Sequence, residues 1–299
     1  MSTGTVTGTT TVATEAAQAA PPEAAPIALA LLGPVSAGVG ERAVAIDGRR
    51  QRVVLSLLAL ARGRVVPAGT LADAIWGGRP PVSARPQIAL CVRALRRAFR
   101  AAGHAEPLIV AASPGYRLRT AHIGVDVEDF DALVDAAASA AGRDAFESAG
   151  ELYRRALALW RGPALDGVGG RVTESEAARL HTLRAAAARA LLDVGETLLA
   201  DGLFDEAEGA FADALGVGEA LDDLPLVAEG SLALGRLCRM LRRTTRAGRH
   251  LTAARVAFLR LGSAAGVGRA SAEIVALAEC EAEGPGAVDS VPRQGRRQD

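Results

Sequence analysis

Residues 85–100 read RPQIALCVRALRRAFR and indicate a helix with two unlike faces. Apolar side chains recur at intervals of three and four residues, the spacing of one buried helix face: Ile88, Cys91, Val92, Leu95 and Phe99. The opposite face has no acidic residue and carries Gln87, Arg93, Arg96, Arg97 and Arg100. Because like charges four residues apart repel one another, this face favours an external anion, most commonly a phosphate backbone. The alternative is a basic, solvated face without a partner.

The net charge of zero hides two segments of opposite sign. Residues 27–119 contain 14 Arg against four acids, whereas residues 120–299 contain 20 Arg against 28 acids. A chain of 299 residues has room for two domains. Its richness in Ala and its few aromatic residues favour helices packed through small side chains. We therefore expect a basic domain that binds a polyanion, followed by an acidic domain.

Several classes of chemistry lack the residues that they need. The chain has no Lys, which excludes a Walker-type phosphate loop and a lysine Schiff base. The cysteines and histidines show no metal-ligand spacing and no nucleophile-base arrangement: Cys91, Cys238, Cys280, His104, His122, His181 and His250. We expect no enzyme, no catalytic residue, no metal and no cofactor. Three scattered cysteines fit unpaired thiols in a reducing cytosol.

The basic segment predicts a sheet, three helices and a hairpin. Short apolar runs ended by turns indicate a small antiparallel sheet: Ile27 to Leu32, Val35 to Val39 and Arg42 to Ile46. The helices are expected over Arg50 to Ala61, Pro67 to Trp76 and about Ser83 to Ala102, with a bridge strand at Val65-Val66 and a hairpin of Leu108 to Ala111 with Tyr116 to Arg119. Ser83 can cap the third helix, and Pro86 fits its first turn. This order is that of an α+β winged helix-turn-helix, with the hairpin as the wing.

From Val125 onward the pattern predicts helices alone. The first is marked by Phe130, Leu133 and Val134, and the others span Phe146 to Trp160, Glu174 to Ala200, Phe204 to Leu215, Leu226 to Leu241, Ala247 to Leu261 and Ser271 to Glu281. Paired helices of this length, with Ala at the crossings, are typical of an all-α tetratricopeptide-like solenoid. Trp76 and Trp160 each close an amphipathic helix, so we expect both to anchor a core.

The two ends of the chain predict disordered tails. Residues 1–26 are dominated by Thr, Ala and Pro, and residues 283–299 by Gly, Pro, Arg and Gln. The N-terminus lacks the basic start and apolar core of a secretory signal, and no stretch approaches the roughly 18 apolar residues of a membrane span. We expect domains at residues 27–120 and 125–282 in a soluble, cytoplasmic protein.

The chain resembles the Streptomyces antibiotic regulatory protein family over roughly Ile27 to Leu241, and short motifs in both domains carry the resemblance. The first domain carries Gly33-Pro34, Arg50-Gln51-Arg52, Val65-Val66, Leu71, Ile75-Trp76-Gly77, Pro80-Pro81, Ala84-Arg85, Leu95-Arg96-Arg97 and Pro114-Gly115-Tyr116-Arg117-Leu118. The second carries residues 156–165 (ALALWRGPAL), 176–180 (EAARL) and Leu183-Arg184. Where the family usually has Asn, Gln, Tyr and Arg along the recognition helix, this chain has Pro86, Ala89, Cys91 and Ala94, so its base preference cannot be copied from relatives.

The resemblance implies a response-regulator-type winged helix joined to a bacterial transcriptional activation domain. The helix from Arg85 would then lie in the major groove, where Arg can read guanine. The expected DNA-binding residues are Arg79, Arg85, Gln87, Arg93, Arg96, Arg97, Arg100, Arg117 and Arg119. Of these, Gln87 and Arg93 are expected at bases, Arg96, Arg97 and Arg100 at phosphates, and Arg79, in the loop before the helix, at phosphate or RNA polymerase.

Two of these arginines lie on the wing, where Arg117 and Arg119 alternate with Tyr116 and Leu118. They either contact the minor groove or phosphates, or protect an exposed strand edge by their charge. Some arginines of the set could instead form ion pairs with Asp73 or Glu106.

The sequence thus predicts a sequence-specific DNA-binding transcriptional regulator. The resemblance implies an activator of an antibiotic biosynthetic gene cluster that binds direct repeats near promoters as a dimer and recruits RNA polymerase. A repressor made of the same parts is an alternative. So is a tetratricopeptide-like interaction adaptor whose winged helix has lost its affinity for DNA, which the apolar residues Pro86, Ala89 and Ala94 favour.

Overall fold

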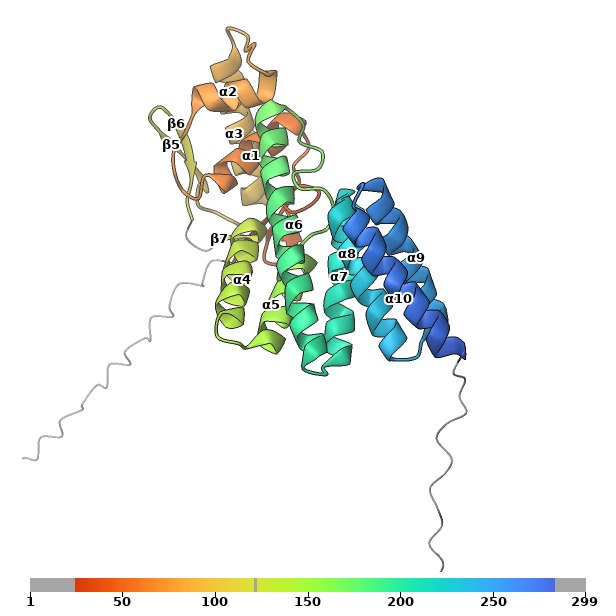
Figure 1. Ribbon diagram of the computed structural model, residues 1–299. Coiled ribbons are helices and arrows are strands. Elements are labelled where there is room, and N and C mark those ends of the chain that lie inside the picture. Colours follow the sequence, from red (N-terminus) through yellow and green to blue (C-terminus); the bar gives the residue numbers. More distant parts are fainter. Residues whose placement is uncertain (1–24, 121–122, 283–299) are drawn as a thin grey trace, which may run out of the picture.

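The computed structural model describes residues 25–120 and 123–282, which form a winged helix-turn-helix followed by an all-helical domain (Figure 1). This architecture confirms the predicted fold class. The predicted tails fall almost entirely on residues 1–24 and 283–299, which lie outside the described residues, as does His122.

The first sheet pairs the start of the chain with a strand from the end of the domain. Strands β1 (Ile27–Ala30), β2 (Ser36–Val39) and β3 (Arg42–Ala43) are antiparallel, as predicted, with Ile27 opposite Val39. Strand β7 (Ile123–Val125) adds to β1 in parallel, with Ile27 opposite Ile123. The sequence pattern did not predict β7, because three residues are too few to show alternation.

Three helices and a second sheet complete the first domain. Helices α1 (Arg49–Leu60), α2 (Ala68–Trp76) and α3 (Ala84–Ala101) pack on one another, and β4 (Val66–Pro67) pairs with the hairpin of β5 (Ile109–Ala112) and β6 (Gly115–Leu118). The hairpin of β5 and β6 is the wing. Gly115 has to be glycine here, since a Cβ atom would lie 2.0 Å from the carbonyl oxygen of Val66.

The start of α3 differs from its prediction in one detail. The Ser83 side chain makes no capping hydrogen bond to the helix backbone, so the expected cap is wrong. Its hydroxyl instead accepts a hydrogen bond of 2.9 Å from the side-chain Nε2 of Gln87. The backbone carbonyl of Ser83 accepts a second hydrogen bond, from the backbone N–H of Gln87. The hydroxyl is thus engaged by a side chain of the first turn, which displaces the usual bond to a backbone N–H.

Seven helices follow, and each packs mainly on the next one along the chain (Figure 1). They are α4 (Asp126–Ala141), α5 (Phe146–Ala158), α6 (Arg171–Ala200), α7 (Phe204–Leu221), α8 (Leu224–Met240), α9 (Thr244–Arg260) and α10 (Ala264–Ala282). Helix α7 continues six residues beyond its predicted end, and helix α10 begins seven residues before its predicted start. Small residues let the helices approach closely, as at Gly195, where a Cβ atom would lie 2.6 Å from the ring of Phe211.

The two domains share a polar junction built around Asp126. Its carboxylate, at the first position of α4, accepts hydrogen bonds from the backbone amides of Leu31 at 2.8 Å and Leu32 at 3.0 Å. Arg161 donates to the same carboxylate at 2.9 Å, and its own amide donates to the Leu32 carbonyl at 2.8 Å. The loop after β1, which contains Gly33-Pro34, is therefore bonded directly to the segment that contains Arg161-Gly162-Pro163. Two motifs of the family resemblance meet at this junction.

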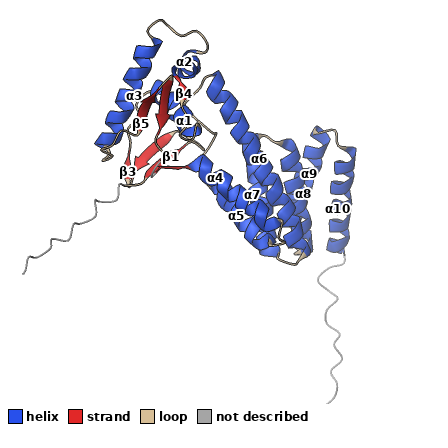
Figure 2. Ribbon diagram, turned by 90° about the vertical axis from the view of Figure 1, so that its left-hand side faces the viewer, coloured by secondary structure: helices blue, strands red, loops and turns tan. Residues whose placement is uncertain are grey.

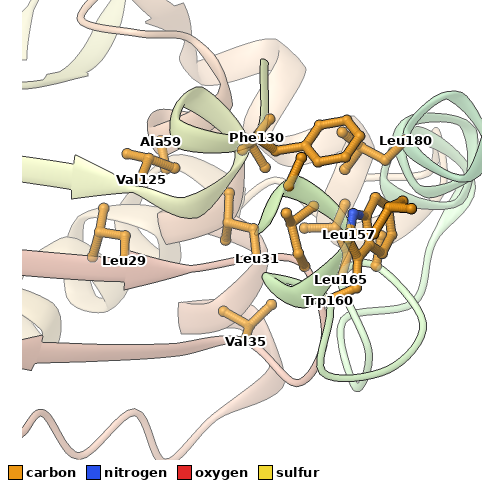
Figure 3. Packing of buried hydrophobic residues seen from close by; sticks show 14 of the residues in the cluster. Leu29, Leu31, Val35, Ala59, Val125, Phe130, Leu157, Trp160, Leu165 and Leu180 are labelled. Atoms are coloured by element: carbon orange, nitrogen blue, oxygen red, sulfur yellow. The ribbon is translucent and has the colours of Figure 1, made fainter. Parts of the chain in front are cut away.

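A continuous hydrophobic core crosses the same junction (Figure 3). Trp160, only 8% exposed, packs edge-on against Phe130 with ring centroids 5.7 Å apart, and Leu31 of the first domain lies in the same cluster. The guanidinium of Arg184 lies 4.8 Å from the Trp160 ring centroid. Trp160 is thus the core anchor that the sequence predicted, whereas Trp76 is only half-buried at the edge of the first domain.

His181 is a titratable residue at the junction. Its Nε2 accepts a hydrogen bond of 2.9 Å from the Ala164 amide, and its ring lies 5.9 Å from that of Trp160. Burial first, and then the positive charge of Arg184, lowers the pKa of His181. The imidazole of His181 is therefore protonated more readily in the unfolded chain than in the folded chain. The stability that neutral His181 contributes is complete above about pH 6.5 and decreases as the pH falls below that value.

We expect His181→Gln to flatten the pH dependence of thermal unfolding. The Gln amide oxygen can accept the Ala164 N–H, but it takes up no proton. Between pH 7 and pH 5, Tm of the variant should therefore fall less steeply than Tm of the parent, as measured by circular dichroism. Burial also lowers the pKa of His250. This residue is present in both proteins, so its contribution to the pH dependence cancels in the comparison. Equal slopes would contradict the role given to His181.

Candidate DNA-binding surface

Helix α3 lies at the margin of the first domain, on the side away from α7–α10 (Figure 2). Its apolar face is buried as predicted, with Ile88, Val92, Leu95 and Phe99 no more than 2% exposed. This burial fixes the rotation of the helix about its axis, because Ile88 and Leu95 pack into the core next to α1. The opposite face, with Arg93, Arg97 and Arg100, is consequently exposed to solvent.

Six exposed arginines gather on α3, the loop before it and the wing: Arg79, Arg85, Arg93, Arg97, Arg100 and Arg117. Within residues 25–120 and 123–282, none of the six forms an ion pair or donates a side-chain hydrogen bond to the protein. Their charge is therefore free to meet an external anion. By contrast, Arg62 on the other side of the domain forms ion pairs with Glu128 and Asp131 of α4.

Three of the nine expected contact residues already have partners in the protein. Gln87 accepts a hydrogen bond from Nη1 of Arg50 at 2.6 Å and donates to Ser83. Arg96 donates from Nε to the Ile109 carbonyl at 2.8 Å, which ties α3 to the first strand of the wing. Arg119 forms an ion pair with Glu106 at 2.7 Å, the alternative that the sequence left open for it. Their contacts with DNA stay predictions.

Two shallow hollows mark this surface. One follows the outward face of α3 and is lined by Leu90, Ala94 and the arginines Arg93, Arg96, Arg97 and Arg100. The other lies between the start of α3 and the turn of the wing, and its lining includes Arg85, Ile88, Ala112 and Tyr116. One hollow thus holds four arginines on the outward face of α3 and the other has Arg85 beside the turn of the wing, which are the elements that a winged helix presents to a duplex.

The sequence interpretation missed two exposed apolar residues on this surface. Leu90, on α3, is 53% exposed, and the side chain of Val82, in the loop before α3, is fully exposed. Leu90 lies three residues before Arg93 and seven before Arg97, so the 3.6-residue period alone places it on the basic face. That spacing was the signal that could have found it.

The described residues also lack the features that a metal site and a membrane span require. In the described part of the chain, no three His, Cys, Asp or Glu side chains form a group that could hold a metal ion. Cys91, the thiol of α3, is half-buried, and this burial raises its pKa. No helix within the described ranges combines the length and the apolarity that crossing a membrane requires.

Comparison with known proteins supports both halves of this description. Residues 46–118 match the family described as "Transcriptional regulatory protein, C terminal", and residues 125–195 match "Bacterial transcriptional activator domain". The first match contains α1, α2, α3 and the wing, and the second contains α4, α5 and most of α6. The fold is therefore a winged helix followed by a helical domain, and each of the two parts matches a domain family of transcriptional regulators.

The chain is similar to several curated regulatory proteins. The chain is 34% identical over 167 residues to the regulatory protein DnrI of Streptomyces peucetius, covering 52% of this chain and 61% of DnrI. It is 33% identical over 164 residues to AfsR of Streptomyces coelicolor, covering 54% of this chain and 16% of AfsR. It is 38% identical over 138 residues to EmbR of Mycobacterium tuberculosis, covering 46% of this chain and 35% of EmbR. The chain therefore matches less than two thirds of the length of each of these relatives.

A solved structure agrees with the fold. Mycobacterium tuberculosis EmbR, in complex with a low-affinity phosphopeptide, superposes with a TM-score of 0.65 at 26% identity, over 85% of this chain and 65% of that chain. This likeness agrees with the two domain matches and with the similarity to DnrI and AfsR. These matches agree with the resemblance to the Streptomyces antibiotic regulatory protein family that the sequence motifs indicate.

Proposed function

We propose that this protein binds double-stranded DNA through α3 and the wing and so regulates transcription in a sequence-specific manner. The observation that carries the proposal is the set of six exposed arginines on α3, on the loop before it and on the wing, none of which has an ion-pair or side-chain hydrogen-bond partner among the described residues. In this arrangement α3 enters the major groove, Arg93 contacts base edges, and Arg97, Arg100, Arg117 and Arg79 contact phosphates.

The finer proposal concerns the target and the partners. The resemblance to the Streptomyces antibiotic regulatory protein family supports an activator of an antibiotic biosynthetic gene cluster, which would bind direct repeats near promoters as a dimer. The helical domain, whose segment 125–195 matches an activation domain, would then contact RNA polymerase and assist self-association. Chromosomal DNA as the target implies action in the bacterial cytoplasm.

Salt dependence tests the role of the arginines. Each arginine that neutralises a phosphate releases condensed counterions, so the logarithm of the binding constant should fall linearly with the logarithm of the salt concentration. Four phosphate contacts per protomer give a slope of about −3.6, or a loss of roughly 150-fold between about 50 and 200 mM salt. The measurement is fluorescence anisotropy on a duplex found by footprinting upstream of the gene. A binding constant that barely changes over this range would contradict the proposal.

A further inference from the structure

The outward face of α3 is apolar at its N-terminal end and basic at its C-terminal end. Pro86, Leu90, Arg93 and Arg97 follow one another at intervals of three and four residues, so they share one face of the helix. Pro86, Ala89 and Leu90 are all exposed, and Leu90 is 53% exposed. The first turns of α3 therefore offer three apolar side chains to whatever contacts this face.

Few groups that form hydrogen bonds remain on this part of the helix. Both polar atoms of the Gln87 side-chain amide already form hydrogen bonds, because the oxygen accepts one from Arg50 and the nitrogen donates one to Ser83. Arg85 and Arg93 are the other polar side chains between residues 84 and 95. A surface of this composition can discriminate poorly by hydrogen bonds, except where an arginine meets guanine.

We propose that Leu90, together with Ala89 and Pro86, reads the C5-methyl groups of thymines in the major groove. This inference rests on the proposed DNA binding of α3. Thymine is the one base whose major-groove edge presents a methyl group, and apolar side chains recognise it by contact. In helix-turn-helix proteins the N-terminal residues of the recognition helix are those that reach base edges, which is where these three residues lie.

Charge decides between DNA and a protein partner for this apolar patch. Leu90 lines the same hollow as Arg93, Arg96, Arg97 and Arg100, and no carboxylate contributes to its lining. An apolar patch beside arginines that form no ion pair with another described residue is complementary to a groove bordered by phosphates. The proposed operator therefore has thymines at the positions facing Leu90, next to a guanine facing Arg93.

Replacing thymine by deoxyuridine removes only the methyl group and so tests the contact directly. The full chain selects its preferred duplex from a random pool, and each thymine of that duplex is then replaced singly. We expect at least one replacement to weaken binding about fourfold, since burying one methyl-sized group contributes about 0.8 kcal/mol. In Leu90→Ala the same replacement should have a markedly smaller effect, which a double-mutant cycle expresses as coupling between Leu90 and that methyl group.

Leu259→Ala is the matched control, because Leu259 is 59% exposed on α9 and distant from α3. This variant should keep the full sensitivity to deoxyuridine. The thymine contact would be overturned if the protein bound its duplex through the arginines but no deoxyuridine replacement weakened this binding. It would also be overturned if deoxyuridine weakened binding equally in the parent and in Leu90→Ala. Either result would leave the proposed function intact. If the chain selects no duplex at all, the proposed function fails and the thymine contact fails with it.

Discussion

The double substitution Arg93→Ala/Arg97→Ala should weaken binding of the cognate duplex by ~30- to ~900-fold per protomer, equivalent to about 2–4 kcal/mol for one base contact and one phosphate contact. Both side chains are exposed on the outward face of α3 and have no ion-pair partner among the described residues. Folding should be unaffected, because the substitution removes a like-charge pair four residues apart. Anisotropy titrations of parent and variant, with circular dichroism to compare their folding, measure the effect.

Arg255→Ala/Arg260→Ala removes the same charge from α9 and serves as the control. These two residues are exposed, and no ion pair holds either of them in the part of the chain that the structure describes. Binding should change little, since α9 lies in the second domain, away from α3 (Figure 2). The adaptor hypothesis predicts that neither double variant loses affinity. An unchanged affinity of Arg93→Ala/Arg97→Ala would therefore favour the adaptor over the regulator.

The orientation of α3 could be predicted from sequence because one periodicity determines it. Apolar residues at intervals of three and four specify the buried face, and Ile88 and Phe99 are buried as expected. The partners of individual arginines could not be predicted in the same way. Whether Arg96 faces a phosphate or the Ile109 carbonyl depends on where the wing lies beside α3, and tertiary packing decides that position.

Glycine explains why the predicted bounds of α7 and α10 were too short. Gly216 and Gly218 near the end of α7, and Gly266 and Gly268 near the start of α10, read as interruptions of a helix. Gly218 and Gly266 instead mark close crossings. A Cβ atom at Gly218 would lie 3.0 Å from the Val227 nitrogen, and one at Gly266 would lie 2.2 Å from the Phe258 ring. Sequence alone does not separate a glycine that ends a helix from one that lets two helices touch.

The junction between the domains was also beyond the sequence pattern. Asp126 looks like an ordinary acidic residue in the first turn of α4, where the helix dipole favours it. Its bonds to Leu31 and Leu32 join residues that are 95 and 94 positions apart. The motifs Gly33-Pro34 and Arg161-Gly162-Pro163 supported the family resemblance, but nothing in their spacing indicated that they bond to one another.

Trp160→Ala should destabilise the protein by about 3–5 kcal/mol, the usual cost of truncating a buried aromatic side chain to Ala. Trp160 packs on Phe130, on His181 and under the guanidinium of Arg184, so its loss leaves a cavity where the two domains meet. Because one hydrophobic cluster extends from β1 to α8, the loss should reach the first domain as well. Hydrogen exchange of the α1 amides should therefore be faster in the variant, in parallel with a lower Tm.

Phe258→Ala provides the contrast, since Phe258 is also buried but belongs to a separate cluster of α8, α9 and α10. It should speed exchange in α9 and α10 and leave α1 protected. Trp160→Phe should be much milder than Trp160→Ala, because it retains an aromatic ring, and the buried indole N–H has no hydrogen-bond partner among the described residues to lose. If Trp160→Ala lowers protection only in α4–α6, the junction does not couple the stability of the helical domain to that of the first domain.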